Sequence, residues 1–306
     1  MNLASFVHDA LAAGTVLSMA GLGLLVNERV GVINLGAEGL MLVGAVTGFA
    51  VAAETHLPWL AFVAGAFAAA LLAGAFAWLV VWLNANQYAT GLAVTLFGSG
   101  FSALVGVGYV GRKLDIQLNH SIPGLRDIPF LGTALFRQHP LVYLTVALCL
   151  LLSWFFWHTR TGLVVRAIGE SPEAAHALGY RVRWIRLAAV VAGGALCGMA
   201  GTFLSVAYTP LWVEGMVSAR GWIALALTVF ATWRPTRLLL GAYLFGGVNV
   251  LQLQLQARGV HIIPAQFMNM LPYLATILVL VVISSNPVWI RLNMPSSLGK
   301  PFYPTQ

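Results

Sequence analysis

Long uninterrupted apolar stretches dominate this sequence and limit the folds that it can adopt. A stretch of about 18 or more apolar residues is long enough to cross the hydrocarbon core of a bilayer as a helix. Because backbone polar groups in lipid must be satisfied internally, we predict an all-α polytopic membrane protein with about nine transmembrane helices, within a range of eight to ten. The predicted apolar segments lie near 11–26, 31–53, 59–83, 90–110, 140–158, 187–208, 221–233, 238–255 and 270–285.

The charge content supports the same interpretation. Only 8% of the residues are charged, whereas a soluble domain usually carries about a quarter. Residues 1–306 are therefore expected to form a single transmembrane domain. Two segments, 11–26 and 221–233, are short for a core of ~30 Å, so one of them is a candidate for a re-entrant segment.

The net charge of +7 is interpreted as a topology signal and not as a nucleic-acid surface, because the basic residues fall in the connections between apolar segments. Ten lie on one predicted side and six on the other, and four of those six fall in the long loop 111–139. The positive-inside rule then places the connection 159–186 and the C-terminus in the cytoplasm, and loop 111–139 outside. The expected location is a bacterial inner (plasma) membrane.

Several kinds of chemistry have no support in the sequence. The phosphate-binding pattern G-x-x-x-x-G-K-[ST] does not occur, so ATP hydrolysis of the P-loop kind is not expected. The histidines fall in loops or at segment ends, and Cys149 and Cys197 lie within apolar segments, which argues against a haem or metal site. We predict that this chain is not an enzyme and holds no metal or cofactor.

Polar residues inside the apolar segments are the candidate solute contacts. Glu38 lies in the second segment beside two glycines and Asn34, and a charge there costs about 2.5–3.5 kcal/mol unless it faces a cavity or a partner. This pattern predicts either a locally broken helix along a solute pathway or a structural hydrogen bond between helices. Asn249 in the eighth segment either binds the solute or joins helices through hydrogen bonds of its amide. Phe97 in the fourth segment either stacks on a flat solute or packs within the protein.

Two connections carry further candidates. Asn86, Gln87 and Thr90 belong to an uncharged polar connection, which is either a solvated turn or a set of hydrogen-bonding groups for a neutral solute. In the connection 159–186, residues 171–179 predict a short helix with Ser171 as its cap, proline at the first position and glycine at the exit. Such a helix could dock into a partner or rest on the membrane surface.

Glycine pairs four residues apart, at Gly44 and Gly48 and at Gly194 and Gly198, allow helix backbones to approach closely. Packing within this chain is the favoured interpretation, and a dimer seam is the alternative.

Several motifs together resemble the permeases of ABC importers for ribose-type sugars, branched-chain amino acids and nucleosides, most closely the nucleoside subgroup served by basic-membrane-protein lipoproteins. The similarity covers most of the chain, roughly 20 to 285. The motifs are V-I-N-L-G-A-E-G at 32–39, N-Q-x-x-T-G-L-A at 86–93, G-E-S-P-E-A-A at 169–175, V-E-G-M at 213–216, and A-R-G-W-I-A-L-A at 219–226 followed by W-R-P at 233–235.

The resemblance implies a function and partners. The chain would move a nucleoside or a simple sugar into the cytoplasm by alternating access, beside a second permease that is expected to be a different chain. A cytoplasmic ABC ATPase would bind ATP and Mg, and an extracytoplasmic binding protein would deliver the solute. The solute pathway that the resemblance implies is lined or bordered by Asn34, Glu38, Asn86, Gln87 and Thr90. Phe97 and Asn249 are added to the predicted pathway because of their side chains alone. The implied coupling helix that docks on the ATPase comprises Gly169, Glu170, Pro172, Glu173, Ala174, Ala175 and Gly179.

A rival function is a secondary transporter that works alone on an ion gradient with Glu38 as its coupling site. This rival predicts uptake without ATP, whereas the importer depends on a partner ATPase.

Overall fold

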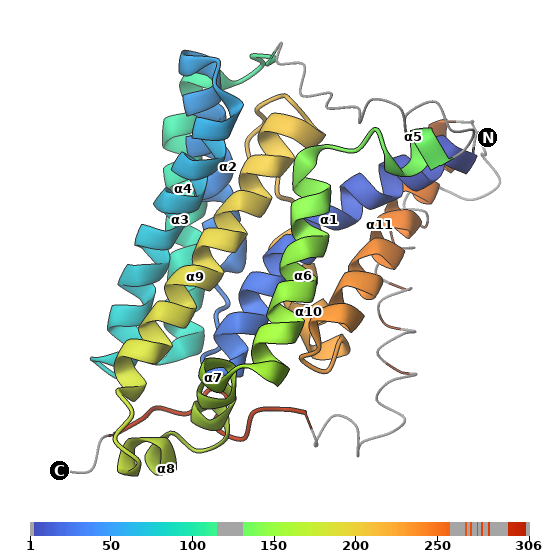
Figure 1. Cartoon of the computed structure of the whole chain (residues 1–306). Coiled ribbons are helices and arrows are strands. Elements are labelled where there is room, and N and C mark those ends of the chain that lie inside the picture. The colour runs from blue at the N-terminus through green and yellow to red at the C-terminus, as the bar shows by residue number, and fades with distance from the viewer. Residues whose placement is uncertain are drawn as a thin grey trace.

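Within the residues that the computed structural model describes, 3–114, 131–257 and 293–303 with isolated helical positions between 267 and 281, the chain folds into helices. Seven of these helices are long and apolar enough to cross a membrane, and they pack into one bundle (Figure 1). The all-α polytopic fold is thereby confirmed. The long helices are α1 (Leu3–Arg29), α2 (Ala37–Thr55), α3 (Pro58–Val81), α4 (Gln87–Gly106), α6 (Pro140–His158), α9 (Val182–Thr202) and α11 (Pro235–Ala257).

Shorter elements connect or extend them. The π-helical η2 continues α9 directly, so the two together form one span of 27 residues. The short elements are η1 (Val107–Tyr109), α5 (Leu131–Leu135), α7 (Arg160–Glu170), α8 (Pro172–Ala177), η2 (Phe203–Tyr208) and α10 (Arg220–Phe230).

The first predicted segment, 11–26, was too short. Helix α1 has 27 residues and continues through the polar residues that flank the predicted segment. Asn27 and Glu28 are buried against other helices, at 0% and 2% exposure, so tertiary packing tolerates polar groups that hydropathy alone interprets as a boundary. This segment is therefore not re-entrant.

The other short segment, 221–233, does not cross as a single helix. Its helix, α10, has 11 residues and is about 16 Å long, roughly half of a ~30 Å hydrocarbon core. The C-terminal end of α10 lies beside the end of α1, because Arg29 Nη2 donates to the Trp233 carbonyl at 2.6 Å. Its N-terminus therefore lies deep in the bundle, and the preceding chain from 209 to 219 contains no long helix.

The long connections differ from their prediction or lie partly outside the described residues. The connection 159–186 is largely helical, since α7 and α8 occupy most of it and α9 begins at Val182 instead of 187. Loop 111–139 contains α5, but residues 115–130 lie outside the described part of the chain. The ninth predicted segment, 270–285, also falls mainly outside it.

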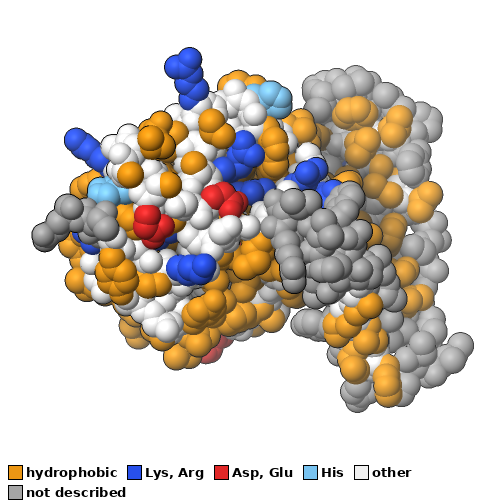
Figure 2. All heavy atoms as spheres, turned by 90° about the horizontal axis from the view of Figure 1, so that it is seen from below, with side chains coloured by type: hydrophobic (Ala, Val, Ile, Leu, Met, Phe, Trp, Pro, Cys, Tyr) orange, Lys and Arg blue, Asp and Glu red, His pale blue; other side chains and the backbone are white. Residues whose placement is uncertain are grey.

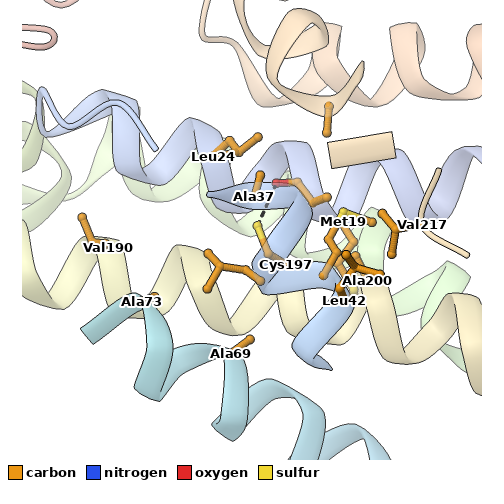
Figure 3. Packing of buried hydrophobic residues seen from close by; sticks show 14 of the residues in the cluster. Met19, Leu24, Ala37, Leu42, Ala69, Ala73, Val190, Cys197, Ala200 and Val217 are labelled. Atoms are coloured by element: carbon orange, nitrogen blue, oxygen red, sulfur yellow. Dashed lines mark hydrogen bonds between the residues drawn. The ribbon is translucent and has the colours of Figure 1, made fainter. Parts of the chain in front are cut away.

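Helix α9 forms the centre of the bundle and packs against α1, α2 and α3 (Figure 3). A side chain on Gly44 of α2 would collide with the backbone of Gly198 on α9, and one on Gly198 would collide with the Gly65 carbonyl of α3. Cys197 also contacts α1, where its thiol donates to the Ala20 carbonyl at 3.7 Å. The glycine pairs thus serve packing within the chain, as favoured.

A buried threonine offers a test of this packing. Thr202 Oγ1 donates both to the Gly44 carbonyl of α2, at 2.9 Å, and to the Gly198 carbonyl of its own helix, at 3.0 Å. We expect Thr202→Val to lower the free energy of unfolding by about 0.6–1.7 kcal/mol, the range for interhelical hydrogen bonds in membranes. Thermal unfolding of the purified protein measures this loss.

The matched control is Thr145→Val. Thr145 is equally buried, and its hydroxyl bonds to the Leu141 carbonyl within its own helix, at 2.8 Å. An equal loss in both variants would show that the contact between α2 and α9 contributes nothing.

Basic side chains lie at the end of the bundle that carries α7 and α8. Helices α7 and α8 and residues 293–303 lie at one end, and the turn between α2 and α3 lies at the other (Figure 1). Figure 2 views the α7–α8 end and shows Lys and Arg side chains spread over it, with acidic side chains among them. This distribution agrees with the sequence analysis, in which most basic residues fall in connections on one predicted side of the membrane.

Candidate functional site

Glu38 connects the start of α2 to the start of the half-length helix α10. Its two carboxylate oxygens accept hydrogen bonds from the backbone N–H groups of Ala219, at 2.8 Å, and Gly221, at 2.7 Å. Ala219 is the cap of α10 and Gly221 lies in its first turn, where N–H groups lack helical partners and the helix dipole favours negative charge. Helix α2 begins at Ala37, so the predicted broken helix around Glu38 is wrong: the glycines mark where the helix starts.

The chain before α10 is held in an unusual conformation. Ser218 and Ala219 both have positive φ, 49° and 64°, which costs energy for residues with a Cβ. The guanidinium of Arg220 donates to the carbonyls of Met216 and Val217 at 2.9 and 3.0 Å. Arg220 is thus half-buried at the head of α10, with its guanidinium bound to the preceding backbone.

A cavity of about 540 Å³ lies directly above this helix start. Pockets for small molecules commonly measure about 300–1,000 Å³ and combine apolar walls with a few polar groups. Aromatic, amide, hydroxyl and guanidinium groups all line this one. Its lining residues are Ala13, Leu17, Tyr208, Ser218, Arg220, Ile223, Phe245, Gly246, Asn249, Gln252 and Leu253.

A second cavity of about 570 Å³ shares Tyr208, Arg220 and Leu253 with the first. Asp9 of α1 and Gln254 of α11 are among its lining residues. Since α1 begins and α11 ends at the end of the bundle away from α7 (Figure 1), the two cavities form a polar recess between α1, η2, α10 and α11 in that half of the protein.

Asn249 lines the recess, as its prediction as a pathway residue requires. Glu38 is not among the lining residues of this cavity. Its carboxylate accepts a hydrogen bond from the Ala219 N–H, and the neighbours of Ala219 in the chain, Ser218 and Arg220, do line the cavity. The carboxylate therefore supports the floor of the recess from behind.

Asn34 and Gln87 lie elsewhere, around the connection between α1 and α2. Asn34 is fully buried, and its Oδ1 accepts from the Gly36 N–H at 2.9 Å. Gln87 is 4% exposed, and its Oε1 accepts from the Ile33 N–H at 2.8 Å. The two amides thus bind this connection to itself and to the start of α4.

The remaining predicted pathway residues belong to α4. Asn86 caps this helix, since its Oδ1 accepts from the N–H groups of Tyr88 and Ala89 at 2.9 and 3.1 Å. Thr90 Oγ1 donates back to the Asn86 carbonyl at 2.8 Å. Phe97 is 57% exposed on the surface of the bundle and stacks on Phe101. The structure therefore does not bring the seven residues together in one site.

The short helix predicted from the capping pattern is present as α8. Ser171 Oγ accepts from the Ala174 N–H at 3.3 Å, and Pro172 occupies the first turn. Gly179 has a φ of +87°, the left-handed conformation that a helix exit requires. The start and the exit of this helix are as predicted.

The seven predicted coupling residues do not share one surface of α8. Pro172 and Ala175 are buried, while Glu173 and Ala174 are exposed. Leu178, which follows the helix, has 78% of its surface exposed and was not predicted. An exposed leucine immediately after a capped helix was the available signal.

Comparison with known proteins decides the family. Residues 6–282 match the family described as the permease component of the branched-chain amino acid transport system. The chain belongs to this family of ABC importer permeases. The permease is accordingly a multi-pass membrane protein and not an enzyme.

Three relatives illustrate the similarity. The permease is 41% identical to a putative glucose ABC transporter permease protein, TsgC13, of Haloferax volcanii, over 96% of each chain. It is 31% identical to the nucleoside ABC transporter permease protein NupC of Lactococcus lactis, over 91% of this chain and 92% of the relative. A glucose ABC transporter permease protein, TsgB13, also of Haloferax volcanii, is 27% identical over 63% of this chain and 55% of its own length. No solved structure matches the permease significantly.

Several residues of the recess were missed from the sequence. Tyr208 and Arg220 stand in segments whose shape, the π-helical η2 and the irregular chain before α10, hydropathy does not reveal. A signal was available on α11, where Asn249 and Gln252 are three residues apart and so lie on the same face of the helix.

Proposed function

We propose that the permease carries a polar, uncharged solute with a ring, first a nucleoside and second a simple sugar, and that the recess above α10 binds it. The carrying observation is the lining of that recess. Tyr208 and Phe245 can stack on a flat ring, while Asn249, Gln252 and Ser218 offer neutral donors and acceptors. The nucleoside and glucose permeases among the relatives have names that agree with this solute class.

The proposed partners follow from the family. A second permease would complete the translocation unit, and we propose a different chain, since TsgB13 and TsgC13 are two similar permeases in one organism. A cytoplasmic ABC ATPase would bind ATP and Mg, and an extracytoplasmic binding protein would deliver the solute. The permease itself would need no cofactor.

The proposed location is the inner (plasma) membrane, and the proposed orientation places α7 and α8 on its cytoplasmic side. Residues 293–303 lie at the same end (Figure 1). The basic residues at that end support this orientation through the positive-inside rule. The recess would then open outward, and ATP binding at the ATPase would move α8 and convert the permease to an inward-open form.

The predicted pathway residues receive different roles in this proposal. Asn249 would contact the solute, and Glu38 would position the head of α10. Asn34 and Gln87 would hold the α1–α2 connection through which the solute leaves. Asn86 and Thr90 would fix the start of α4, and Phe97 would border the second permease.

Replacement of Asn249 tests the proposed solute contact. Loss of a hydrogen bond to the solute is expected to weaken its binding about tenfold, equivalent to ~1.4 kcal/mol, so Asn249→Ala raises the KM for uptake with little effect on protein yield. The measurement is ATP-dependent uptake of labelled nucleosides and sugars into vesicles that hold the complete transporter. Gln256→Ala, on the same helix but outside the residues that line the recess, is the control. If Asn249→Ala and Gln256→Ala have the same KM, the recess does not bind the solute.

A further inference from the structure

Residues 293–303 are not needed to build the recess, yet they make specific contacts with four parts of the permease. This segment is called the strap here. It lies across the α7–α8 end of the bundle, where Figure 1 shows it running beneath the helices. Its contacts join α7, α8, the start of α9 and the connection between α1 and α2.

The strap first binds the end of α7. The Ser297 N–H and hydroxyl both donate to the Gly169 carbonyl, at 2.9 and 2.7 Å. The Ser296 hydroxyl donates to Glu170 Oε2 at 2.6 Å. Glu170, which was predicted to dock on the ATPase, therefore has its carboxylate engaged within the chain.

The strap next packs against α8. Phe302 is 4% exposed and packs in one cluster with Ile168 of α7, Ala175 of α8 and Val182 of α9. Its ring also meets His176 edge-on, with centroids 5.7 Å apart. A helix of six residues buries little surface of its own, and a buried phenylalanine ring removes a large apolar surface from water, so Phe302 is a main anchor of α8.

The strap then reaches the connection between α1 and α2. The Gly299 N–H donates to the Gly31 carbonyl at 3.1 Å, and the Asn293 carbonyl accepts from Arg29 Nη1 at 3.3 Å. Arg186 at the start of α9 donates to the Ser297 hydroxyl at 3.3 Å. From Gly31 the chain continues directly into α2, which begins at Ala37, and on the way the Ile33 N–H donates to Gln87 Oε1 at the start of α4.

We propose that the strap passes the movement of α8 to the α1–α2 connection, and that Phe302 is a positioning residue for this coupling. The inference rests on the proposed function, since it needs α8 to be moved by an ATPase. Its physical basis is a contiguous chain of packed and hydrogen-bonded groups: α8 to Phe302, the strap to Gly31, and the connection to α2, whose first turn holds Glu38 and the head of α10.

The test compares Phe302→Ala with Tyr303→Ala in the complete reconstituted transporter. Tyr303 is the next residue and is 64% exposed, so its loss should change nothing. Residues along a coupling network commonly alter coupling about 2- to 30-fold when replaced, and we expect Phe302→Ala to lower the amount of solute moved per ATP hydrolysed within that range while ATP hydrolysis continues. A general folding defect would instead lower uptake and hydrolysis in the same proportion.

A second measurement keeps this inference separate from the proposed function. A spin label at Tyr180→Cys, just after α8, reports how firmly α8 is held, and it needs no transport. We expect greater label mobility with Phe302→Ala, and with Ser296→Ala if the first variant does not fold, than with Tyr303→Ala. The proposed role of the strap is overturned if the label is equally mobile in all variants. It is also overturned if Phe302→Ala leaves the amount of solute moved per ATP hydrolysed unchanged. Absence of ATP-dependent uptake in the wild type overturns the proposed function, while the mobility result still decides whether the strap holds α8.

Discussion

Glu38→Ala is expected to abolish ATP-driven uptake and to destabilise the permease. The carboxylate accepts two backbone hydrogen bonds at the head of α10, and hydrogen bonds to charged groups contribute about 1.5–3 kcal/mol each. Without them, two backbone donors deep in the protein lose their acceptor, and the strained residues Ser218 and Ala219 lose their restraint. Thermal unfolding and uptake by the reconstituted transporter measure the two effects.

Glu38→Gln sharpens this prediction, because the side chain keeps its shape. The amide has a single acceptor oxygen, and its NH₂ group faces the second backbone N–H, so most of the stability loss should persist. Glu54→Gln is the control: it lies near the other end of α2, where the exposed carboxylate is 3.6 Å from Arg112, and such surface pairs contribute about 0–1 kcal/mol.

The same variant separates the importer from a secondary carrier. In a carrier with Glu38 as its coupling site, Glu38→Gln would preserve the fold and remove ion-driven, ATP-independent uptake. A variant with wild-type stability and this transport defect would contradict the structural role. The geometry favours the importer, since both oxygens of Glu38 are occupied by fixed backbone donors.

Leu178→Asp is expected to prevent the ATPase from docking while leaving the membrane bundle intact. Leu178 is largely exposed after α8 and would insert into a groove of the partner. The few residues that dominate an interface cost at least about 2 kcal/mol when truncated; if Leu178 is one of them, the affinity falls by roughly 30-fold. Titration of the purified permease with its ATPase measures this loss, and uptake should fall with it.

The control for this experiment is Leu57→Asp. Leu57 has 58% of its surface exposed and lies between α2 and α3 at the opposite end of the bundle (Figure 1). Both variants add one charge at an exposed leucine. If the two bind the ATPase equally well, α8 is not the docking element.

Local patterns in the sequence predicted the features that depend on neighbouring residues. The length of apolar segments predicted the membrane helices, because each helix satisfies its backbone within itself. The order Ser171–Pro172 and the later Gly179 predicted α8, because capping involves groups only a few residues apart. The spacing of Asn249 and Gln252 on α11 is a local signal of the same kind, but the predicted pathway contains Asn249 without Gln252.

The tertiary structure decided how these elements meet. The partners of Glu38 lie in α10, far along the chain, and no local pattern links a carboxylate to two N–H groups there. The strap, the close approach of Gly44 and Gly198, and the recess beside Tyr208 likewise join distant segments. Local sequence determines whether a segment is a helix, whereas the partner of each buried polar group is fixed by packing of the whole chain, since a polar group inside the protein must find its hydrogen bonds among whatever surrounds it.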